Sequence, residues 1–447
     1  MSGPSGKAPD FSFRSEPYAW YVVGVLSVTS IIAFIDRQII NLQVEPIKQD
    51  LGISDTQISL LQGFAFVLFY TAMAIPLGRL ADGTNRKWLI VGGMFLWTWA
   101  TAACGLAKTY AQLFAARMFI GVGEATLSPA GFSMLADYFP RQKLGRAIGI
   151  FTGSSFLGTG IALLLGGFLI AALTEMGDVT LPVVGTLKTW QMTFIAVAIP
   201  SFLFLLLMLT VREPPRQDVA AQRQATASKA SIGEVIAFIR ANWGVFGVIY
   251  IGFSILASVQ FGLGAWIPSF FIRVHGYTAG EIGVAYGILV TVLGTLGTVA
   301  GGFLCDWLAQ RGYADANLRT AIIAAVPTIP LVALFPLVSD PQVALMIVAP
   351  MCFLGSMPFG AGTAAIPMIS PNRMRAQLVA VYLLVANLIG PGLGPWLIAV
   401  CTDYVFHDPK MVGMSIVIVC TTLIILGTAV LLAGVKAFRR TVEQAAI

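Results

Sequence analysis

The segment GRLADGTNRK, residues 78–87, decides the fold because a related segment, GGFLCDWLAQR, returns at residues 301–311. The pattern Gly-x-Leu-x-Asp begins at Gly78 in the first segment and at Gly302 in the second, and each copy closes a long apolar stretch. A second echo pairs FPRQKLGRAIGI with SPNRMRAQLVAV, where a proline and basic residues open a new apolar run. One unit is therefore predicted to occur twice in parallel orientation.

The composition places the chain in a membrane. Of its 447 residues, 57% are hydrophobic and only 11% are charged, whereas soluble domains carry about 25% charged residues. Apolar runs of roughly 20 residues are long enough to cross a bilayer as α-helices. The predicted fold is an all-α polytopic membrane protein with spans at 18–43, 56–81, 87–107, 110–137, 146–173, 189–211, 243–272, 282–305, 320–338, 342–369, 376–402 and 412–435.

Basic residues predict the orientation of these twelve spans. With both termini in the cytoplasm, 20 of the 27 Lys and Arg residues fall in cytoplasmic segments, 5 in outer loops and 2 within spans, as the positive-inside rule requires. The net charge of +6 therefore reflects topology and does not call for nucleic acid. The predicted parts are a cytoplasmic tail (1–17), a six-helix bundle (18–211), a cytoplasmic linker with a short interfacial helix (212–242), a second six-helix bundle (243–438) and a cytoplasmic tail (439–447).

Several motifs resemble one transporter family. GRLADGTNRK is similar to a loop motif of the major facilitator superfamily, and RMFIGVGEA (117–125) is similar to the Arg-centred motif of that family's fourth helix. FIDRQIIN (34–41) and GEATLSPAG (123–131) resemble the spinster-like branch, which includes sphingosine-1-phosphate and lysophospholipid exporters. The resemblance implies that two halves rock about a central site. GTGIALLLGG (158–167) lacks the proline of the superfamily's antiporter motif, which weighs against antiport.

The loop motif implies a cytoplasmic latch that forms when the outside is open and breaks when the inside opens. An Asp at a helix end can accept hydrogen bonds from backbone amides while a nearby Arg brackets it. A solvated turn is the alternative interpretation. The predicted gating residues are Gly78, Asp82 and Arg86 in the first half and Asp306 and Arg311 in the second.

Arg117 and Glu124 are the only charged residues from Gln112 to Ala136, inside the span 110–137. An Arg at the bilayer centre costs about 2.5–3.5 kcal/mol on insertion scales, which suggests a function. Their separation of seven residues places both on one helix face, but the Arg117 side chain leans away from Glu124, so each needs another partner. Asp36 of the first span lies at the depth of Arg117, and we predict that these two pair. Glu124, near the midplane, then has no obvious fixed partner. We expect it to be protonated and alone in one state, and ionised in another, where it faces water or a basic group, either Arg117 or Arg37.

These residues receive predicted roles. Glu124 is the principal proton carrier, because a buried carboxyl can gain and lose a proton while an Arg stays charged; Asp36 shares this role. Arg117 is the predicted anchor for an anionic group of the substrate. Arg37 is the second predicted substrate-binding arginine; it lies about 100° round the helix from Asp36, so the two side chains cannot both point squarely into the cavity. A purely structural ion pair is the alternative.

The second half offers polar rather than charged groups. Within its predicted spans there is no Asp, Glu, Lys or Arg apart from Asp306 just beyond one of them. An amphiphile would fit, with its head at Arg117 and its tail along the second half; the alternative is that these helices are apolar because they face lipid. The predicted polar contacts of this wall are Gln260, Tyr286, Thr363 and Asn387.

The predicted function is secondary active transport of an amphiphilic organic solute, such as a lysolipid or sphingoid phosphate, coupled to protons. A drug or organic-anion transporter of the same fold is the alternative. A channel would need a symmetric filter, an enzyme a nucleophile or metal constellation, and an ATP-driven pump a phosphate loop; the sequence displays none of these. Neither a cofactor nor a metal is predicted, and we expect a monomer in a bacterial inner membrane.

Overall fold

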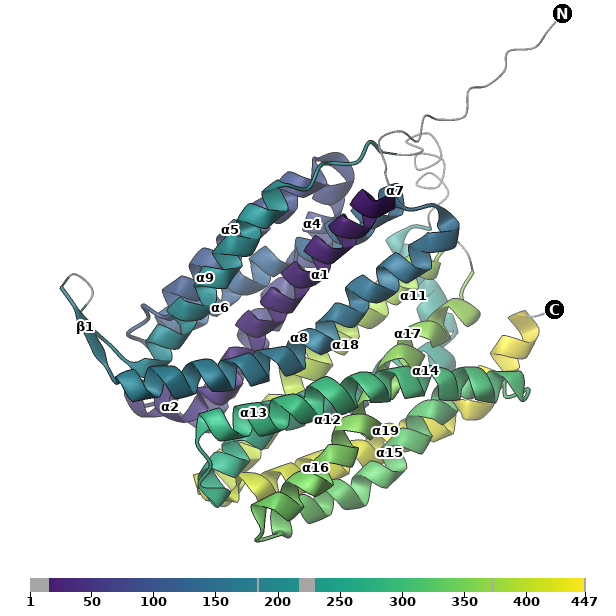
Figure 1. The fold of residues 1–447 in the computed structure, drawn as a ribbon. Helices are drawn as coiled ribbons and strands as arrows, with labels where there is room; N and C mark the ends of the chain where they lie inside the picture. The colour runs from purple at the N-terminus through teal and green to yellow at the C-terminus, as the bar shows by residue number, and fades with distance from the viewer. Residues whose placement is uncertain (1–15, 183–184, 217–229, 372, 446–447) are drawn as a thin grey trace, which may run out of the picture.

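The structure is a computed structural model that describes residues 16–182, 185–216, 230–371 and 373–445 (Figure 1). Most of the predicted N-terminal tail and residues 217–229 of the predicted linker therefore lie outside the described residues. Nearly all of the described chain is helical. The strands β1 (Val179–Leu181) and β2 (Gly185–Leu187) form an antiparallel hairpin.

One group of helices, called here the first half, covers residues 16–209. It contains α1 (Glu16–Gln38), η2 (Ile39–Leu42), α2 (Val44–Leu51), α3 (Asp55–Ser59), η3 (Leu60–Phe64), α4 (Ala65–Gly83), α5 (Arg86–Cys104), α6 (Tyr110–Glu124), α7 (Leu127–Tyr138), α8 (Arg141–Met176) and α9 (Thr189–Leu209). Within it, α1 packs against α8 and α9, and α5 packs against α6 and α9.

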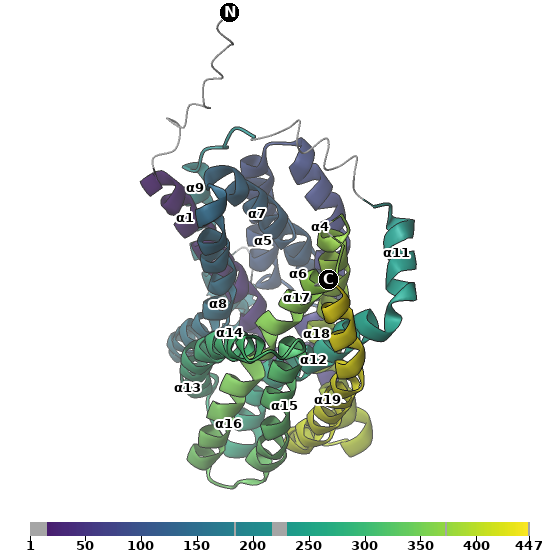
Figure 2. The same cartoon turned by 90° about the vertical axis from the view of Figure 1, so that its right-hand side faces the viewer.

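The other group, the second half, covers residues 243–445. It contains α12 (Trp243–His275), α13 (Ala279–Leu289), η4 (Val290–Gly294), α14 (Thr295–Gln310), α15 (Ala316–Leu334), η5 (Phe335–Leu337), α16 (Pro341–Ser356), α17 (Pro358–Met368), α18 (Arg375–Val400), η6 (Cys401–Phe406), η7 (Pro409–Met411) and α19 (Val412–Ala445). Here α12 packs against α18 and α19, and α15 packs against α16 and α19. The short helix expected at 231–240 corresponds to α11 (Ile232–Ala241), which stands apart from the helix groups in Figure 2.

Within the described residues, ten helical stretches are long and apolar enough to span a membrane. Two of the predicted spans are not among them: 87–107 coincides with α5, and 110–137 coincides with α6 and α7 together. A turn at Ala125 and Thr126 separates α6 from α7, because Pro129 has no N–H to donate to the carbonyl four residues earlier and its ring crowds that carbonyl. The number twelve, the domain boundaries and the side on which the termini lie stay predictions.

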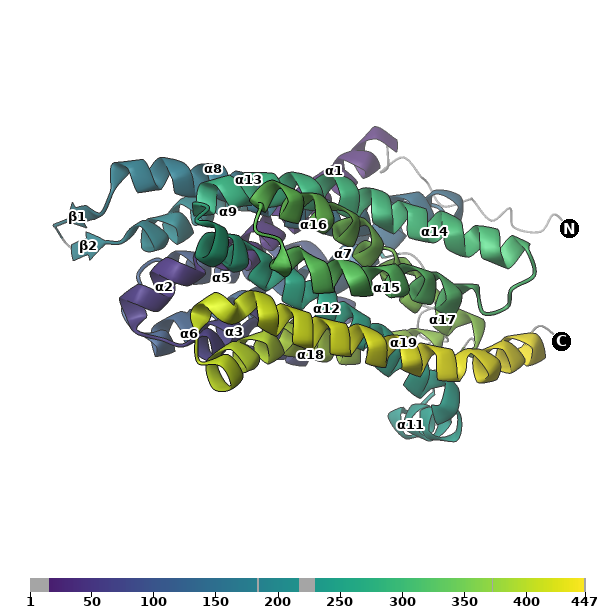
Figure 3. The ribbon, with the colours of Figure 1, turned by 90° about the horizontal axis from the view of Figure 1, so that it is seen from below.

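The two ends of the molecule differ. The β1–β2 hairpin lies at one end of the helices, and the beginning of α1 and the end of α19 lie at the other (Figures 1 and 3). We call these ends the hairpin face and the termini face. In Figure 1, α8 lies beside α13 near the hairpin face and separates from α14 toward the termini face.

Glycines permit the close approach of α8 and α13. A Cβ added at Gly283 would lie 2.7 Å from the Cα of Gly167, and one added at Gly287 would lie 2.6 Å from the backbone nitrogen of Leu164. Real Cβ atoms do not approach other atoms so closely, so the backbones of the two halves touch here without space for a side chain. On the other side of the interface, η3 packs against α18.

Replacing Gly287 with Val should therefore wedge the halves apart at the hairpin face. We expect the distance between spin labels at Gln49 and Lys410, which are exposed on opposite halves at this face, to increase by several ångströms. Double electron–electron resonance spectroscopy on a variant without the native cysteines measures this distance. Gly92→Val is the matched control, because no atom lies within 4 Å of a Cβ at that position. Unchanged distances in Gly287→Val would contradict this account of the interface.

Candidate functional site

A cavity of about 1370 Å³, part of it open to solvent, lies between the two halves. Among the described residues that line it, the only charged ones are Arg37 and Arg117, and both belong to the first half. The predicted polar groups Gln260, Tyr286 and Asn387 line the wall of the second half. Thr363 does not line this cavity; it lies in a neighbouring apolar pocket with Phe253 and Tyr382, so its predicted place was wrong.

Arg117 is bound by main-chain carbonyls. Its Nε donates to the oxygen of Leu61 at 3.1 Å, Nη1 to that of Asp36 at 2.9 Å and Nη2 to that of Arg37 at 3.3 Å. The side chain is fully buried. The carbonyls at the end of an α-helix have no partner within the helix and carry partial negative charge, which explains why Arg117 docks onto the last turn of α1. The predicted ion pair between the Asp36 carboxylate and Arg117 is therefore wrong.

Glu124 pairs with Arg37, one of the two basic partners expected for its ionised state. Its Oε2 lies 2.6 Å from the Nε of Arg37, and the two side chains are 1% and 25% exposed. The backbone changes from α-helix to 3₁₀-helix directly after Gln38, and Arg37 lies at the end of α1 where it reaches both the cavity and α6. Arg37, which the sequence ranked second, is thus the charged side chain that faces the cavity.

Three aromatic rings surround the Arg37 guanidinium. Its Cζ lies 4.8 Å from the ring centroid of Phe34, 4.3 Å from that of Phe66 and 4.9 Å from that of Tyr70. The ion pair with Glu124 uses Nε only, which leaves the two terminal nitrogens outside that pair. An arginine of this kind can grip a carboxylate or phosphate with a two-pronged fork.

Asp36 lies behind this site. Its side chain is fully buried, and Oδ2 accepts a hydrogen bond from the Ser201 hydroxyl of α9 at 3.3 Å. Its Oδ1 has no hydrogen-bond partner among the described residues. Asp36 is not among the residues that line the cavity. A role in proton coupling, as predicted, would have to act through the interior of the first half.

The predicted latch residues lie at the termini face without meeting as expected. Asp82 is exposed, and its carbonyl accepts a hydrogen bond from Arg216. Arg86 is buried and does not bracket Asp82; it pairs with Asp137 at 2.5 Å and with Glu213 at 2.7 Å. Arg86 pairs with these carboxylates because it is buried at the start of α5, where α7 and the segment after α9 each supply one.

The remaining latch residues have contacts within their own halves. Among the described residues, no ion pair joins the end of α4 to the second half. Arg311 lies 3.8 Å above the ring of Trp307, and Asp306 is exposed. Gly78 approaches Pro129 of α7, with 3.8 Å between an added Cβ and the proline Cβ. The latch itself stays a prediction.

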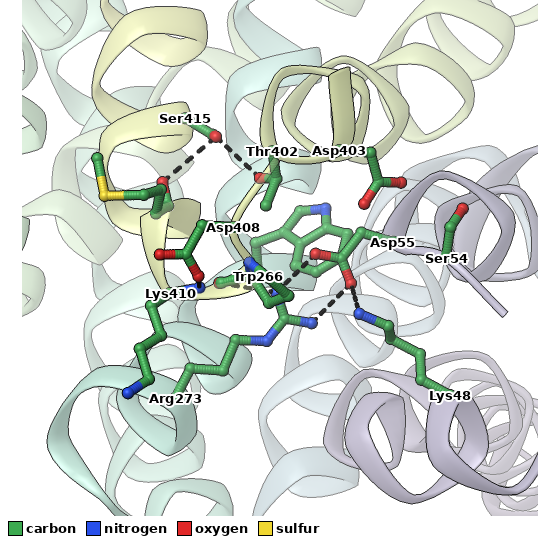
Figure 4. A network of polar contacts seen from close by, with 12 residues as sticks. Lys48, Ser54, Asp55, Trp266, Arg273, Thr402, Asp403, Asp408, Lys410 and Ser415 are labelled. Atoms are coloured by element: carbon green, nitrogen blue, oxygen red, sulfur yellow. Dashed lines mark hydrogen bonds and ion pairs between the residues drawn. The ribbon is translucent and has the colours of Figure 1, made fainter. Parts of the chain in front are cut away.

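The hairpin face carries a polar cluster that sequence reasoning missed (Figure 4). Arg273 of the second half binds both carboxylate oxygens of Asp55 at 2.6 and 2.7 Å and pairs with Glu45 at 2.6 Å. Lys48 also contacts Asp55. The side chains of Arg273 and Asp55 are only 5% and 0% exposed. From the sequence, Arg273 is one of the five basic residues expected in outer loops, and no partner is predicted for it. The acidic residues Glu45 and Asp55 of the facing segment were the signal that could have indicated one.

A second contact lies beside the first. Asp403 of η6, which directly follows α18, accepts hydrogen bonds from the backbone N–H of Thr56 at 2.6 Å and from its hydroxyl at 2.7 Å. Ser54 starts α3 with a capping box, which fixes the orientation of Asp55 and Thr56. Two consecutive residues of the first half are therefore gripped by two side chains of the second half.

Comparison with known proteins identifies the family to which this fold belongs. Residues 26–395 match the sequence profile of the Major Facilitator Superfamily. The chain belongs to this superfamily. A crystal structure of a bacterial homolog to the human lysosomal transporter spinster, in an inward-facing and unoccupied conformation, superposes with a TM-score of 0.75 at 26% identity, covering 96% of this chain and 98% of that one. The predicted family and its spinster-like resemblance are confirmed, and the protein is a multi-pass membrane protein.

Two curated relatives of this superfamily member are transporters. The MFS-type efflux pump of Mycolicibacterium smegmatis is 25% identical over 457 residues, covering 100% of both chains. The hexuronate transporter of Escherichia coli K12 is 27% identical over 303 residues, which is 64% of each chain. Only the second name states a solute, so family membership establishes transport but does not identify what this chain carries.

Replacing Arg273 with Gln should loosen the hairpin face of this transporter. The variant leaves Asp55 buried with Lys48 as its remaining cation, and breaking a buried ion pair is strongly destabilising. We expect hydrogen–deuterium exchange in residues 44–59 and 401–411 to accelerate by about tenfold or more. Arg319→Gln is the control, because Arg319 pairs with Asp315 inside the second half. Equal exchange in the two variants would mean that the cluster does not hold the halves together.

Proposed function

We propose that the chain is a secondary active transporter that carries an amphiphilic organic anion by alternating access, coupled to protons, with the structure representing the state open toward the termini face. The main support is the cavity, where Arg37 presents a positive charge on one wall and the other wall is uncharged. In line with this state, both ion pairs that join the two halves within the described chain lie at the hairpin face.

The chemistry of the cavity favours an anionic head and an apolar body. Arg37 supplies charged N–H donors, and the facing wall contains Phe261, Phe359 and Pro395 together with the polar side chains Gln260 and Asn387. A phosphate or carboxylate bound at Arg37 would place a hydrocarbon chain against these rings. Each Å² of apolar surface that this contact removes from water would stabilise the complex by about 25 cal/mol. A lysolipid or sphingoid phosphate has this form. The anchor is thus proposed to be Arg37, with Arg117 fixing the backbone beneath it.

The alternative solute is a drug or a compact organic anion, carried by symport or antiport. The names of the two curated relatives, an efflux pump and a hexuronate transporter, support this alternative. Both classes of anion would use Arg37. They differ in whether the apolar wall contributes to affinity, so lysophosphatidate and glucuronate are suitable probes for telling them apart.

Proton coupling would arise from the pair of Arg37 and Glu124. In the substrate-free state the carboxylate is stabilised by Arg37 at 2.6 Å. An anion that draws the guanidinium into the cavity would leave Glu124, which is 1% exposed, charged and alone. Because an unpaired buried charge costs several kcal/mol, the carboxylate would take up a proton instead. One proton would then accompany one anion, and Asp36 could relay it within the first half.

The orientation completes the proposal. The termini face would be cytoplasmic, in keeping with the distribution of Lys and Arg along the sequence. We propose a monomer in a bacterial inner membrane, with the latch around Asp82 closing the cytoplasmic side when the hairpin face opens.

Replacing Glu124 with Gln should separate transport from the proton gradient. The amide cannot release a proton, so accumulation of lysophosphatidate driven by a pH gradient should fall at least about tenfold, while exchange without a gradient persists. Both fluxes can be measured in the same liposomes. Glu175→Gln, at the exposed end of α8, is the control. Full gradient-driven accumulation by Glu124→Gln would refute the coupling role and direct attention to Asp36.

A further inference from the structure

One aromatic ring lies beside both charged groups of the cavity. The ring centroid of Phe66 is 4.3 Å from the Cζ of Arg37 and 6.0 Å from that of Arg117. Phe66 is 4% exposed and lines the cavity. The two guanidinium groups come from different helices and repel each other, and Arg117 is tied to the carbonyls of Asp36 and Arg37 themselves. Two guanidinium groups this close to one ring require a neighbouring group that interacts favourably with both positive charges.

An aromatic face has this property. Its quadrupole presents negative potential to a cation above the ring, and the attraction grows when the pair is shielded from water. A guanidinium that stacks on a ring uses its own flat face, so the N–H donors in its plane stay free for an acceptor. A carboxylate partner instead occupies those donors. The aromatic contact can therefore hold Arg37 while its terminal nitrogens remain directed at the cavity.

The backbone fixes this ring in its place. Arg117, Gly121 and Glu124 follow one another at spacings of four and three residues, which puts them on one face of α6. A Cβ added at Gly121 would collide with the carbonyl oxygen of Phe66 and lie 3.2 Å from the nitrogen of Tyr70. The α4 backbone thus rests directly on α6 between its two charged residues.

A second ring extends the same platform. Phe66 and Tyr70 are stacked, with ring centroids 5.4 Å apart and planes 23° apart, and Tyr70 lies 4.9 Å from Arg37. Both rings come from successive turns of α4, so their position depends on the contact at Gly121.

We infer that Phe66 is a positioning residue for the anion site: its ring holds Arg37 in the cavity when Glu124 is neutral, and thereby makes the site selective for charged over uncharged amphiphiles. This inference rests on the proposed function, in which an anion binds Arg37. Without the Phe66 ring, Arg37 would lose the nearest of its three aromatic contacts once Glu124 is protonated. The side-chain entropy that the loosened arginine regains would then oppose binding of the anion.

The test compares two probes that share a tail. Lysophosphatidate carries a phosphate, and the monoacylglycerol of the same chain length is uncharged. Calorimetric titration of the full chain in detergent should show that Phe66→Leu weakens lysophosphatidate binding about tenfold and changes monoacylglycerol binding less than twofold. Phe66→Tyr, which keeps the ring, should restore the parent affinity. Phe261→Leu removes a ring from the opposite wall and should not lower the preference for the charged probe.

A shape-preserving variant guards against loss of folding. Incorporating 3,4,5-trifluorophenylalanine at position 66 keeps the ring but weakens its negative face, so only the charged probe should lose affinity. Equal losses for both probes in Phe66→Leu, together with no effect of fluorination, would reduce Phe66 to packing and overturn the inference.

Arg37→Gln separates this inference from the function on which it rests. If Arg37→Gln abolishes lysophosphatidate binding and the Phe66 variants keep the parent preference, the positioning role alone is wrong. If the parent binds neither probe, or if Arg37→Gln binds lysophosphatidate as the parent does, the proposed anion site and the inference both fail.

Discussion

A carboxylate and a guanidinium that meet at 2.6 Å in the interior of a membrane protein constrain everything around them. Neither charge can be left alone in that environment, because losing one partner costs several kcal/mol for the other. The neighbouring residues reflect this constraint. Arg117 is occupied by three carbonyls and does not compete for Glu124. Aromatic rings surround the Arg37 guanidinium, and no second carboxylate among the described residues pairs with it. Arg37 and Glu124 can therefore separate in this cavity only if an anion binds the guanidinium or a proton binds the carboxylate.

The two ends of the molecule give this exchange a direction. At the hairpin face, Arg273 holds Asp55 with two hydrogen bonds in a buried position, and Asp403 holds the start of α3. At the termini face, the residues of the loop motif in the first half interact with that half and with the linker segment after α9, and no ion pair among the described residues joins them to the second half. Opening the hairpin face must therefore break a desolvated ion pair, while the other end offers no comparable restraint within the described chain. A ligand can drive that change only to the extent that it binds one state better than the other.

Much of the architecture followed from sequence patterns. Apolar runs and the repeated Gly-x-Leu-x-Asp pattern predicted a helical membrane protein with two related halves, because hydrophobic length and turn chemistry are local properties. The family followed from the resemblance of GRLADGTNRK and RMFIGVGEA to its motifs. Hydrophobic length alone did not show that α6 stops at Glu124. The break follows from Pro129, a local signal that the apolar pattern does not contain. Helical periodicity correctly placed Arg117 and Glu124 on one face and implied that each needs another partner. It paired Arg117 with the Asp36 carboxylate, whereas the structure supplies the Asp36 carbonyl.

Partner choice failed for a physical reason. A carbonyl at a helix end attracts a cation as a carboxylate does, but every residue has one, so the sequence carries no mark of it. The cluster at Arg273 was missed in a similar way, because it joins segments more than 200 residues apart whose proximity only the packed halves reveal. Gln260, Tyr286 and Asn387 reached the cavity as expected, since they project from the faces that the two halves turn toward each other.

The central claim is that an anion displaces Glu124 from Arg37 and that the carboxylate then takes up a proton. Proton exchange on binding measures this directly: lysophosphatidate is added to purified protein in weakly buffered detergent solution at constant pH, and a pH indicator records the protons taken up. The account predicts uptake of about one proton per bound anion, over and above any change in the ionisation of the ligand itself, and none for the uncharged monoacylglycerol. Tight binding of lysophosphatidate without proton uptake would contradict it.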